Sequence, residues 1–144
     1  MPAYNTRRSA VIGATPEACF DALTDYERLP EWQGAVCDVR VLERDEQGRG
    51  CVVEYEVDAR VRKVRYRLRQ IHDRPHRLGS EYLGGDFRDF AGEWRFKPLV
   101  GGRTQVDLEV RLDPGRFVPG PVRSLIARAV IRGALEDLDA YFER

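Results

Sequence analysis

The sequence has few of the residues that mark metal-binding and disulfide-rich proteins. Its 144 residues include three cysteines, Cys19, Cys37 and Cys51, with no CxxC pair. This spacing predicts buried, reduced thiols rather than disulfides or a zinc site. The two histidines, His72 and His76, are four residues apart, which suits a metal only on a helix, and the intervening proline predicts a turn. We therefore expect no metal and no cofactor.

Net charge and long apolar runs are absent as well. The 24 acidic residues balance the 24 basic ones, so DNA is not an expected partner and a ribosome contact is disfavoured. Nearly all basic residues are arginine, which is typical of a GC-rich bacterial genome. No apolar run reaches the ~18 residues of a membrane span, and the amino-terminal residues lack the apolar stretch of a signal peptide. These absences predict a soluble, cytoplasmic protein.

Signatures of the common enzyme classes are also missing. The sequence contains no GxSxG, no P-loop, no HExxH and no dinucleotide-binding glycine pattern after a strand. We assign no catalytic residue, and a non-enzymatic role is favoured over an enzymatic one.

The carboxyl-terminal quarter, in contrast, contains a long apolar helix. Pro121 suits a first helical turn, and residues 122–142 continue without another proline. Apolar residues recur at helical spacing around most of the circumference, so this helix is expected to be wrapped by the rest of the chain. Gly133 interrupts the bulky stripe, which predicts floor space for a ligand or a close strand approach.

The charges of this helix allow two interpretations. Arginines come early and acidic residues late, against the preference of the helix dipole. A basic cavity mouth near Arg116 and Arg123 is one explanation, and solvent-exposed pairs such as Arg132–Glu136 are the favoured one.

Between the two ends the hydrophobic period changes to two, which predicts half-buried antiparallel strands. Opposite charges alternate on the outer faces of two neighbouring strands, and these should pair in register: Glu54, Glu56 and Asp58 with Arg65, Arg67 and Arg69. The expected elements are a strand at 8–13, a helix at 16–24 capped by Thr15, a short helix or bend at 25–32, and strands that include 36–44, 50–59, 61–71 and 105–112.

This element order predicts the fold class. One strand, two short helices, about six further strands and one long helix indicate an α+β protein with the helix against one face of an antiparallel sheet. A sheet of about seven strands must curl, and its concave face can hold the helix. No linker or repeat divides the chain, so residues 1–144 are expected to form a single domain.

Residues 9–32 read SAVIGATPEACFDALTDYERLPEW, and residues 92–107 read GEWRFKPLVGGRTQVD. Both stretches resemble the START-like (SRPBCC, helix-grip) superfamily, also described as polyketide cyclase/dehydrase and lipid-transport proteins. The spacing of Asp25-Tyr, Pro30-Glu-Trp, Gly85-Asp-Phe-Arg and Gly92-Glu-Trp-Arg-Phe is closest to the coenzyme Q-binding and ribosome-association-toxin branch. The resemblance covers almost the whole chain and implies a hydrophobic cavity between the sheet and the last helix.

Aromatic and small residues on the expected inner faces are the candidate ligand contacts. Flat apolar walls with a few hydroxyl groups are the usual composition of a small-molecule site, although each aromatic also suits an ordinary core position. The candidate ligand-binding residues are Trp32, Tyr55, Tyr66, Tyr82, Arg88, Phe90, Trp94, Ala129 and Gly133.

Arg88 has two possible orientations. Period two from Phe90 and Trp94 sends Arg88 into the concavity, where it would need a carboxylate or an anionic or carbonyl-bearing ligand. A bulge at Gly84-Gly85 would instead turn it to solvent or toward Asp86, Asp89 or Glu81, and the glycine pair favours this orientation.

Together these patterns predict a protein that binds, and possibly transports, a lipid, an isoprenoid quinone or a polyketide-like aromatic. The first alternative is a polyketide aromatase/cyclase or dehydrase, although no cyclase cluster matches residue by residue. The second is a toxin-like module that contacts the ribosome. The sequence does not indicate an oligomeric state.

Overall fold

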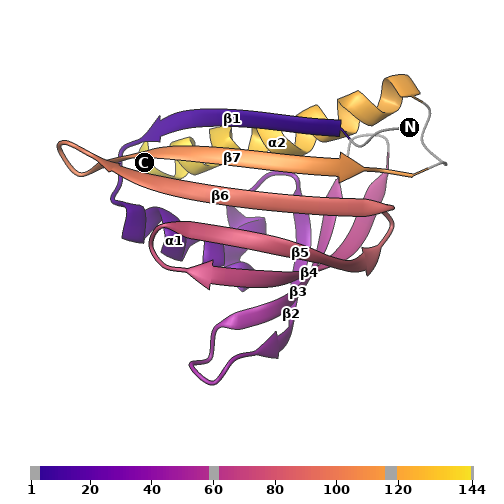
Figure 1. Ribbon diagram of the computed structural model, residues 1–144, viewed down its shortest axis with the longest axis horizontal. Coiled ribbons are helices and arrows are strands. Elements are labelled where there is room, and N and C mark those ends of the chain that lie inside the picture. The colour runs from indigo at the N-terminus through magenta and orange to yellow at the C-terminus, as the bar shows by residue number, and fades with distance from the viewer. Residues whose placement is uncertain (1–3, 59–61, 116–119, 144) are drawn as a thin grey trace.

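One antiparallel sheet and one long helix dominate the protein (Figure 1). The structure is a computed structural model that describes residues 4–58, 62–115 and 120–143, with the backbone alone for Tyr4 and residues 120–130. The elements in chain order are β1 (Tyr4–Ile12), α1 (Pro16–Thr24), the 3-10 helix η1 (Tyr26–Glu31), β2 (Val36–Arg44), β3 (Gly50–Asp58), β4 (Lys63–Asp73), β5 (Arg77–Gly85), β6 (Asp89–Leu99), β7 (Arg103–Asp113) and α2 (Gly120–Glu143).

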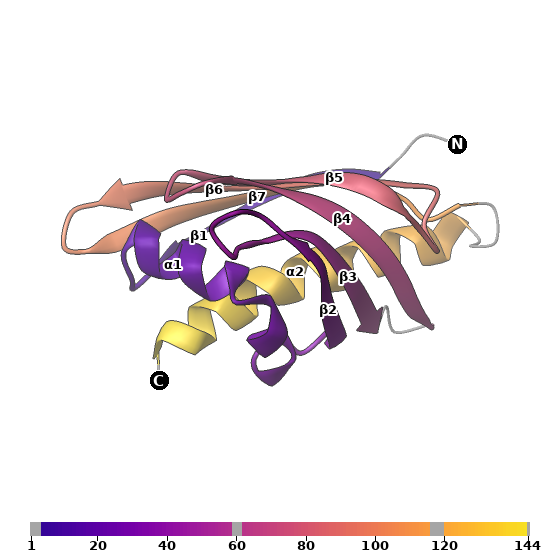
Figure 2. The ribbon, with the colours of Figure 1, turned by 90° about the horizontal axis from the view of Figure 1, so that it is seen from below.

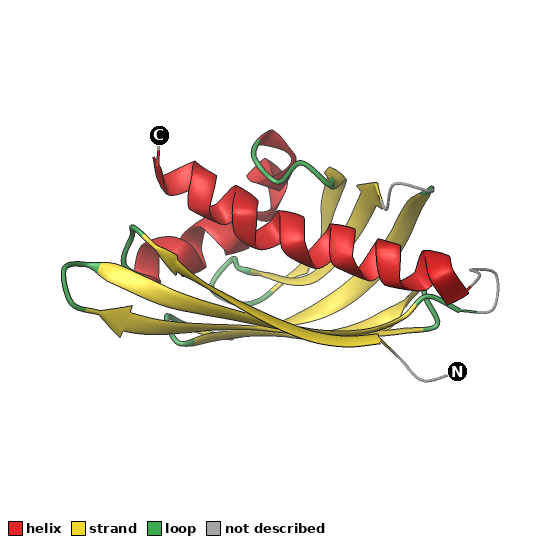
Figure 3. Ribbon diagram, turned by 90° about the horizontal axis from the view of Figure 1, so that it is seen from above, coloured by secondary structure: helices red, strands yellow, loops and turns green. Residues whose placement is uncertain are grey.

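The strands form one sheet in the order β1-β7-β6-β5-β4-β3-β2. All six neighbouring pairs are antiparallel, and all except β1–β7 are consecutive along the chain. The sheet curls, and all helices lie on its concave side (Figures 2 and 3). The predicted α+β helix-grip architecture is therefore confirmed.

The two short helices follow from local sequence signals. The Thr15 side chain accepts a hydrogen bond from the Ala18 amide at 3.2 Å, and Pro16 begins α1, where a missing N–H costs nothing. Pro30 limits the next segment to the short η1, as expected for a proline inside a helical turn. The prediction for residues 16–32 is confirmed.

The helix α2 covers the concave face from the β1 side of the sheet. In its carboxyl-terminal half, Ile131, Leu135 and Leu138 are buried, whereas Arg132 and Glu136 are exposed and pair at 2.9 Å. The pair agrees with the favoured explanation of the helix charges, which is pairing on a solvent-exposed stripe. The alternative basic mouth involves Arg116 and Arg123, whose side chains lie outside the described residues.

Strand register separates a charged outer face from an apolar inner face. The acidic face of β3 lies beside the basic face of β4, as predicted: Glu54 lies opposite Arg67, Glu56 opposite Arg65 and Asp58 opposite Lys63. Arg69 lies opposite Val52 and has no acidic residue directly across from it.

The prediction for the three cysteines is only partly correct. All three thiols are free. Cys19 is buried, and burial raises the pKa of its thiol to about 11. The prediction of buried thiols is wrong for Cys37, which is exposed. It lies on β2, an edge strand of the sheet that pairs with β3 alone.

Candidate ligand-binding cavity

A cavity of about 120 Å³ lies inside the concavity, between the sheet and the helices. A single buried water needs roughly 10–15 Å³, so this space exceeds what one or two waters would fill. The described residues that line it are uncharged and mostly apolar: Leu23, Leu29, Gln33, Ala35, Val36, Tyr55, Val57, Tyr66, Leu68, Gln70, Leu78, Ser80, Phe90, Gly92, Trp94, Leu108, Val110, Ile131 and Ala134.

Aromatic rings form one wall of the cavity. Tyr55 and Tyr66 face each other across β3 and β4, with ring centroids 5.5 Å apart and nearly parallel. Tyr66 also stacks on Phe90 at 5.4 Å and contacts Phe87 at 5.1 Å. Because buried aromatic pairs fix each other's orientation, this wall presents a flat and rigid apolar surface.

Small residues leave the space open. On neighbouring strands Ser80 lies opposite Gly92, and both project toward the cavity. A Cβ at position 92 would lie 3.2 Å from the Phe90 ring, which is close contact. Ala134 of α2 borders the same space. A larger side chain at any of these three positions would reduce the cavity volume.

A chain of three side chains provides the polar part of the wall. The Ser80 Oγ donates to the Gln70 Oε1 at 3.0 Å, and the Gln70 Nε2 donates to the Tyr55 Oη at 2.6 Å. Burial raises the pKa of both the Tyr55 and Tyr66 hydroxyls above the ordinary value of 10.0, so both stay protonated at neutral pH. These groups can donate hydrogen bonds, but they are poor bases.

Residues after η1 close the cavity against α2. The Gln33 Nε2 donates to the Ala134 carbonyl at 3.0 Å, and the Gly34 amide donates to the Asp137 Oδ2 at 2.8 Å. Trp32 lies outside this contact and packs on Tyr141 with ring centroids 4.7 Å apart. The η1–β2 connection is therefore tied to the helix at three successive residues.

Four of the candidate residues lie together at the cavity, and the others lie elsewhere. Tyr55, Tyr66, Phe90 and Trp94 line it. Among the described lining residues, Trp32, Tyr82 and Gly133 do not occur, and the side chain of Ala129 lies outside the described part. The Tyr82 hydroxyl donates to the Phe87 carbonyl at 2.6 Å, so it holds the β5–β6 turn.

Gly133 is not among the described residues that line the cavity. A Cβ built there meets no described atom within 4 Å, so the glycine does not serve a close strand approach among the described residues either. The helical period allows the glycine to face either way, and the structure turns it from the cavity while Ala134 borders it.

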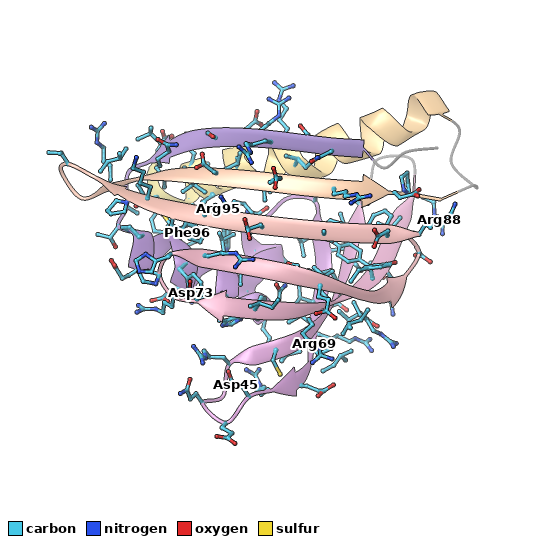
Figure 4. All side chains as sticks on the ribbon, in the orientation of Figure 1. Asp45, Arg69, Asp73, Arg88, Arg95 and Phe96 are labelled. Atoms are coloured by element: carbon cyan, nitrogen blue, oxygen red, sulfur yellow. The ribbon has the colours of Figure 1, made fainter. Side chains whose placement is uncertain are left out.

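Arg88 points to solvent. Its side chain is 62% exposed and lies 3.9 Å from Asp113, rather than pairing with Asp86, Asp89 or Glu81 (Figure 4). The register between β4 and β5 shifts opposite Leu83, and Gly84 and Gly85 both have positive φ. The inward orientation is therefore wrong. Arg88 lies between β5, which ends at Gly85, and β6, which begins at Asp89, so the alternation of the strand does not extend to it.

Sequence reasoning missed the polar chain. Gln70 continues the inward alternation of Val64, Tyr66 and Leu68, so its position on the apolar face was available from period two. An uncharged polar residue at an inward position indicates a buried hydrogen-bonding group, and Gln70 is such a residue. Its partner Ser80 is ten residues away, and only the β4–β5 register shows that they meet.

Among the described residues, no group of three or more His, Cys, Asp or Glu side chains is placed to hold a metal ion. No helix in the described ranges is long and apolar enough to cross a membrane.

Comparison with known proteins identifies the family. Residues 12–139 match the family model described as polyketide cyclase / dehydrase and lipid transport. The chain belongs to this family. Its helix-grip fold is shared with a START superfamily protein of known structure.

The chain is also similar to a curated relative. The granaticin polyketide synthase bifunctional cyclase/dehydratase of Streptomyces violaceoruber is 26% identical over 140 residues, which is 95% of this chain and 42% of that protein. The family member described here thus spans about two-fifths of the length of its relative.

Solved structures agree on the fold. A START superfamily protein from Mycobacterium smegmatis superimposes with a TM-score of 0.87 at 17% identity, covering 96% of this chain and 97% of the other. The Zhui aromatase/cyclase from Streptomyces sp. R1128 gives a TM-score of 0.79 at 20% identity, covering 98% and 92%. At these identities the likeness shows the shared fold of the family and not a shared ligand.

Proposed function

We propose that this protein binds a hydrophobic small molecule with an aromatic ring in the cavity between the sheet and α2. The observation that carries the proposal is the mostly apolar cavity of about 120 Å³ with flat aromatic walls and a single polar edge. Enclosed apolar space with a few placed polar groups is the usual composition of a ligand site. The family description, which includes lipid transport, supports the same function.

The cavity volume favours one of the three ligand classes expected from the sequence. A cavity of roughly 150 Å³ lined by apolar residues accepts benzene, so this one of about 120 Å³ suits a single ring. A lipid or an isoprenoid quinone would require the η1–β2 connection or α2 to move outward. A polyketide-like aromatic is therefore favoured over the other two.

Native mass spectrometry of freshly purified protein tests this function. A co-purifying apolar molecule, released on unfolding, is the expected result. Toluene provides a second test, because emission of Trp94 should change when the ring enters the cavity. The Trp32→Phe variant leaves Trp94 as the single tryptophan. A ligand-free protein whose Trp94 emission does not respond to toluene would refute the proposal.

A polyketide cyclase or dehydrase is the second candidate. It is favoured by the match of nearly the whole chain to a bifunctional cyclase/dehydratase, and by the protonated tyrosine hydroxyls, which could polarise a ketone. Such a reaction also needs a base, and the described lining residues contain no Asp, Glu, His, Lys or Cys. Incubation with a poly-β-ketone thioester tests it: formation of an aromatic product faster than without protein would establish the activity.

A further inference from the structure

The polar chain at the cavity has a direction. The Ser80 hydroxyl donates a hydrogen bond to the Gln70 Oε1, so the Gln70 Nε2 is the end that faces Tyr55. The Nε2 then donates to the Tyr55 oxygen. Each donation fixes the next group, because an amide has one acceptor end and one donor end.

This direction leaves the Tyr55 proton free. Among the described residues no acceptor takes it, although Tyr55 is 8% exposed and lines the cavity. Tyr66 is in a similar state: its hydroxyl has no hydrogen-bond partner among the described residues, and the residue is 6% exposed. Both hydroxyls border the cavity with a proton to donate, so a ligand with an acceptor atom is favoured there.

Charge restricts the ligand further. The described lining residues contain no cation that could pair with a carboxylate. Arg88, the candidate for such pairing, lies at the solvent-exposed start of β6 (Figure 4). Moving an anion from water into this space carries a large desolvation cost, which none of the described lining residues would offset.

We infer that the cavity selects uncharged ring compounds that carry a carbonyl-type oxygen acceptor, with Tyr55 as the donor and Gln70 and Ser80 as positioning residues. This inference rests on the proposed binding function and adds the chemical class of the ligand. The carbonyl oxygen accepts from the Tyr55 hydroxyl while the ring lies against the Tyr66 and Phe90 rings.

Three one-ring probes of matched size test the selectivity: acetophenone, α-methylstyrene and benzoate. The first two have the same shape and differ in the oxygen acceptor, and the third adds a negative charge. Calorimetric titration of the full chain should show acetophenone binding about tenfold more tightly than α-methylstyrene, as expected for one buried hydrogen bond. Benzoate should bind more weakly than both.

Variants assign the roles. Tyr55→Phe should bind acetophenone and α-methylstyrene equally, whereas Tyr66→Phe should keep the preference. Ser80→Ala frees the Gln70 amide to rotate and accept a hydrogen bond from the Tyr55 hydroxyl, so the ratio of acetophenone to α-methylstyrene affinity should fall. Ser80→Thr keeps the hydroxyl and should keep this ratio, while its added methyl group lowers the affinity for both probes. Loss of preference in Tyr66→Phe but not in Tyr55→Phe would overturn the assignment to Tyr55.

The outcomes separate the two proposals. If none of the three probes binds, the binding function itself fails. If acetophenone and α-methylstyrene bind with equal affinity, or benzoate binds best, the cavity still binds ligands but the selectivity inferred from the Ser80–Gln70–Tyr55 chain is wrong.

Discussion

The two faces of the sheet are built from the same strands and differ in almost every physical respect. The outer face carries ion pairs between adjacent strands, such as the exposed pair Arg7–Glu109 at 2.8 Å. The inner face buries aromatic and aliphatic side chains against α1, η1 and α2 and leaves a cavity among them. Alternation of side chains along each strand produces both faces.

The difference teaches where stability and function are located. Exposed ion pairs contribute about 0–1 kcal/mol each, because water screens the charges and long side chains lose entropy. A buried Leu contributes several times more. Outer-face substitutions should therefore be tolerated, whereas inner-face substitutions should change either stability or ligand binding, depending on whether they border the cavity.

The largest effect is expected from Leu112→Ala on β7. This side chain is 1% exposed, so truncation should lower the free energy of unfolding by about 2–5 kcal/mol. Arg111→Ala, one residue earlier and on the outer face, should change it by less than about 0.5 kcal/mol. Urea denaturation of both variants measures the contrast, and equal losses would break the comparison between the faces.

The next effect concerns ligand affinity rather than stability. Ala134→Leu places a larger side chain at the cavity and should lower acetophenone affinity at least about tenfold, or 1.4 kcal/mol. Gly133→Leu is the matched control, because a Cβ there meets no described atom within 4 Å. It should keep the affinity and stabilise the helix slightly. Calorimetric titration decides, and an equal loss in both folded variants would contradict the cavity boundary.

A smaller effect should depend on pH, through His72 on the inner face of β4. Its Nε2 lies 2.8 Å from the Tyr26 hydroxyl, and its buried Nδ1 has no hydrogen-bond partner. Burial lowers its pKa below the ordinary 6.5, and the Arg49 guanidinium adds to this, while Asp45 opposes it in part. The unfolded chain then binds the proton more readily, so stability is retained above about pH 6.5 and falls as the pH drops below it.

The His72 effect can be measured by urea denaturation between pH 5 and 8. Wild-type protein should lose stability on acidification more steeply than His72→Gln, which cannot titrate. Parallel pH profiles for the two proteins would show that burial of this histidine does not contribute.

The smallest effect is expected on the outer face. Arg7 and Glu109 are directly opposite on β1 and β7, with side chains 66% and 43% exposed. A double-mutant cycle with Arg7→Ala and Glu109→Ala should give a coupling of about 0.2–1 kcal/mol that decreases in high salt. A coupling above this range that does not depend on salt would show that outer-face ion pairs stabilise the protein as much as buried inner-face side chains do.

The candidate site was only partly predictable. Period two placed Tyr55, Tyr66, Phe90 and Trp94 on the inner face, and these four residues border the cavity. The same reasoning gave Arg88 two orientations, because a bulge resets the alternation and its effect depends on the β4–β5 register. Trp32 could not be placed from sequence, because its position depends on the contact with Tyr141, more than a hundred residues away.

The sequence by itself determined the element order, the alternation of the strands and the apolar character of α2, because these properties depend on residues within a few positions of each other. Only the tertiary structure decided which inward residues border empty space and which are packed. Gly92 and Ala134 border the cavity and Gly133 does not, and the Ser80–Gln70–Tyr55 chain exists only in the observed register. Cavities and hydrogen-bond partners depend on the relative positions of separate strands and helices, which no local pattern specifies.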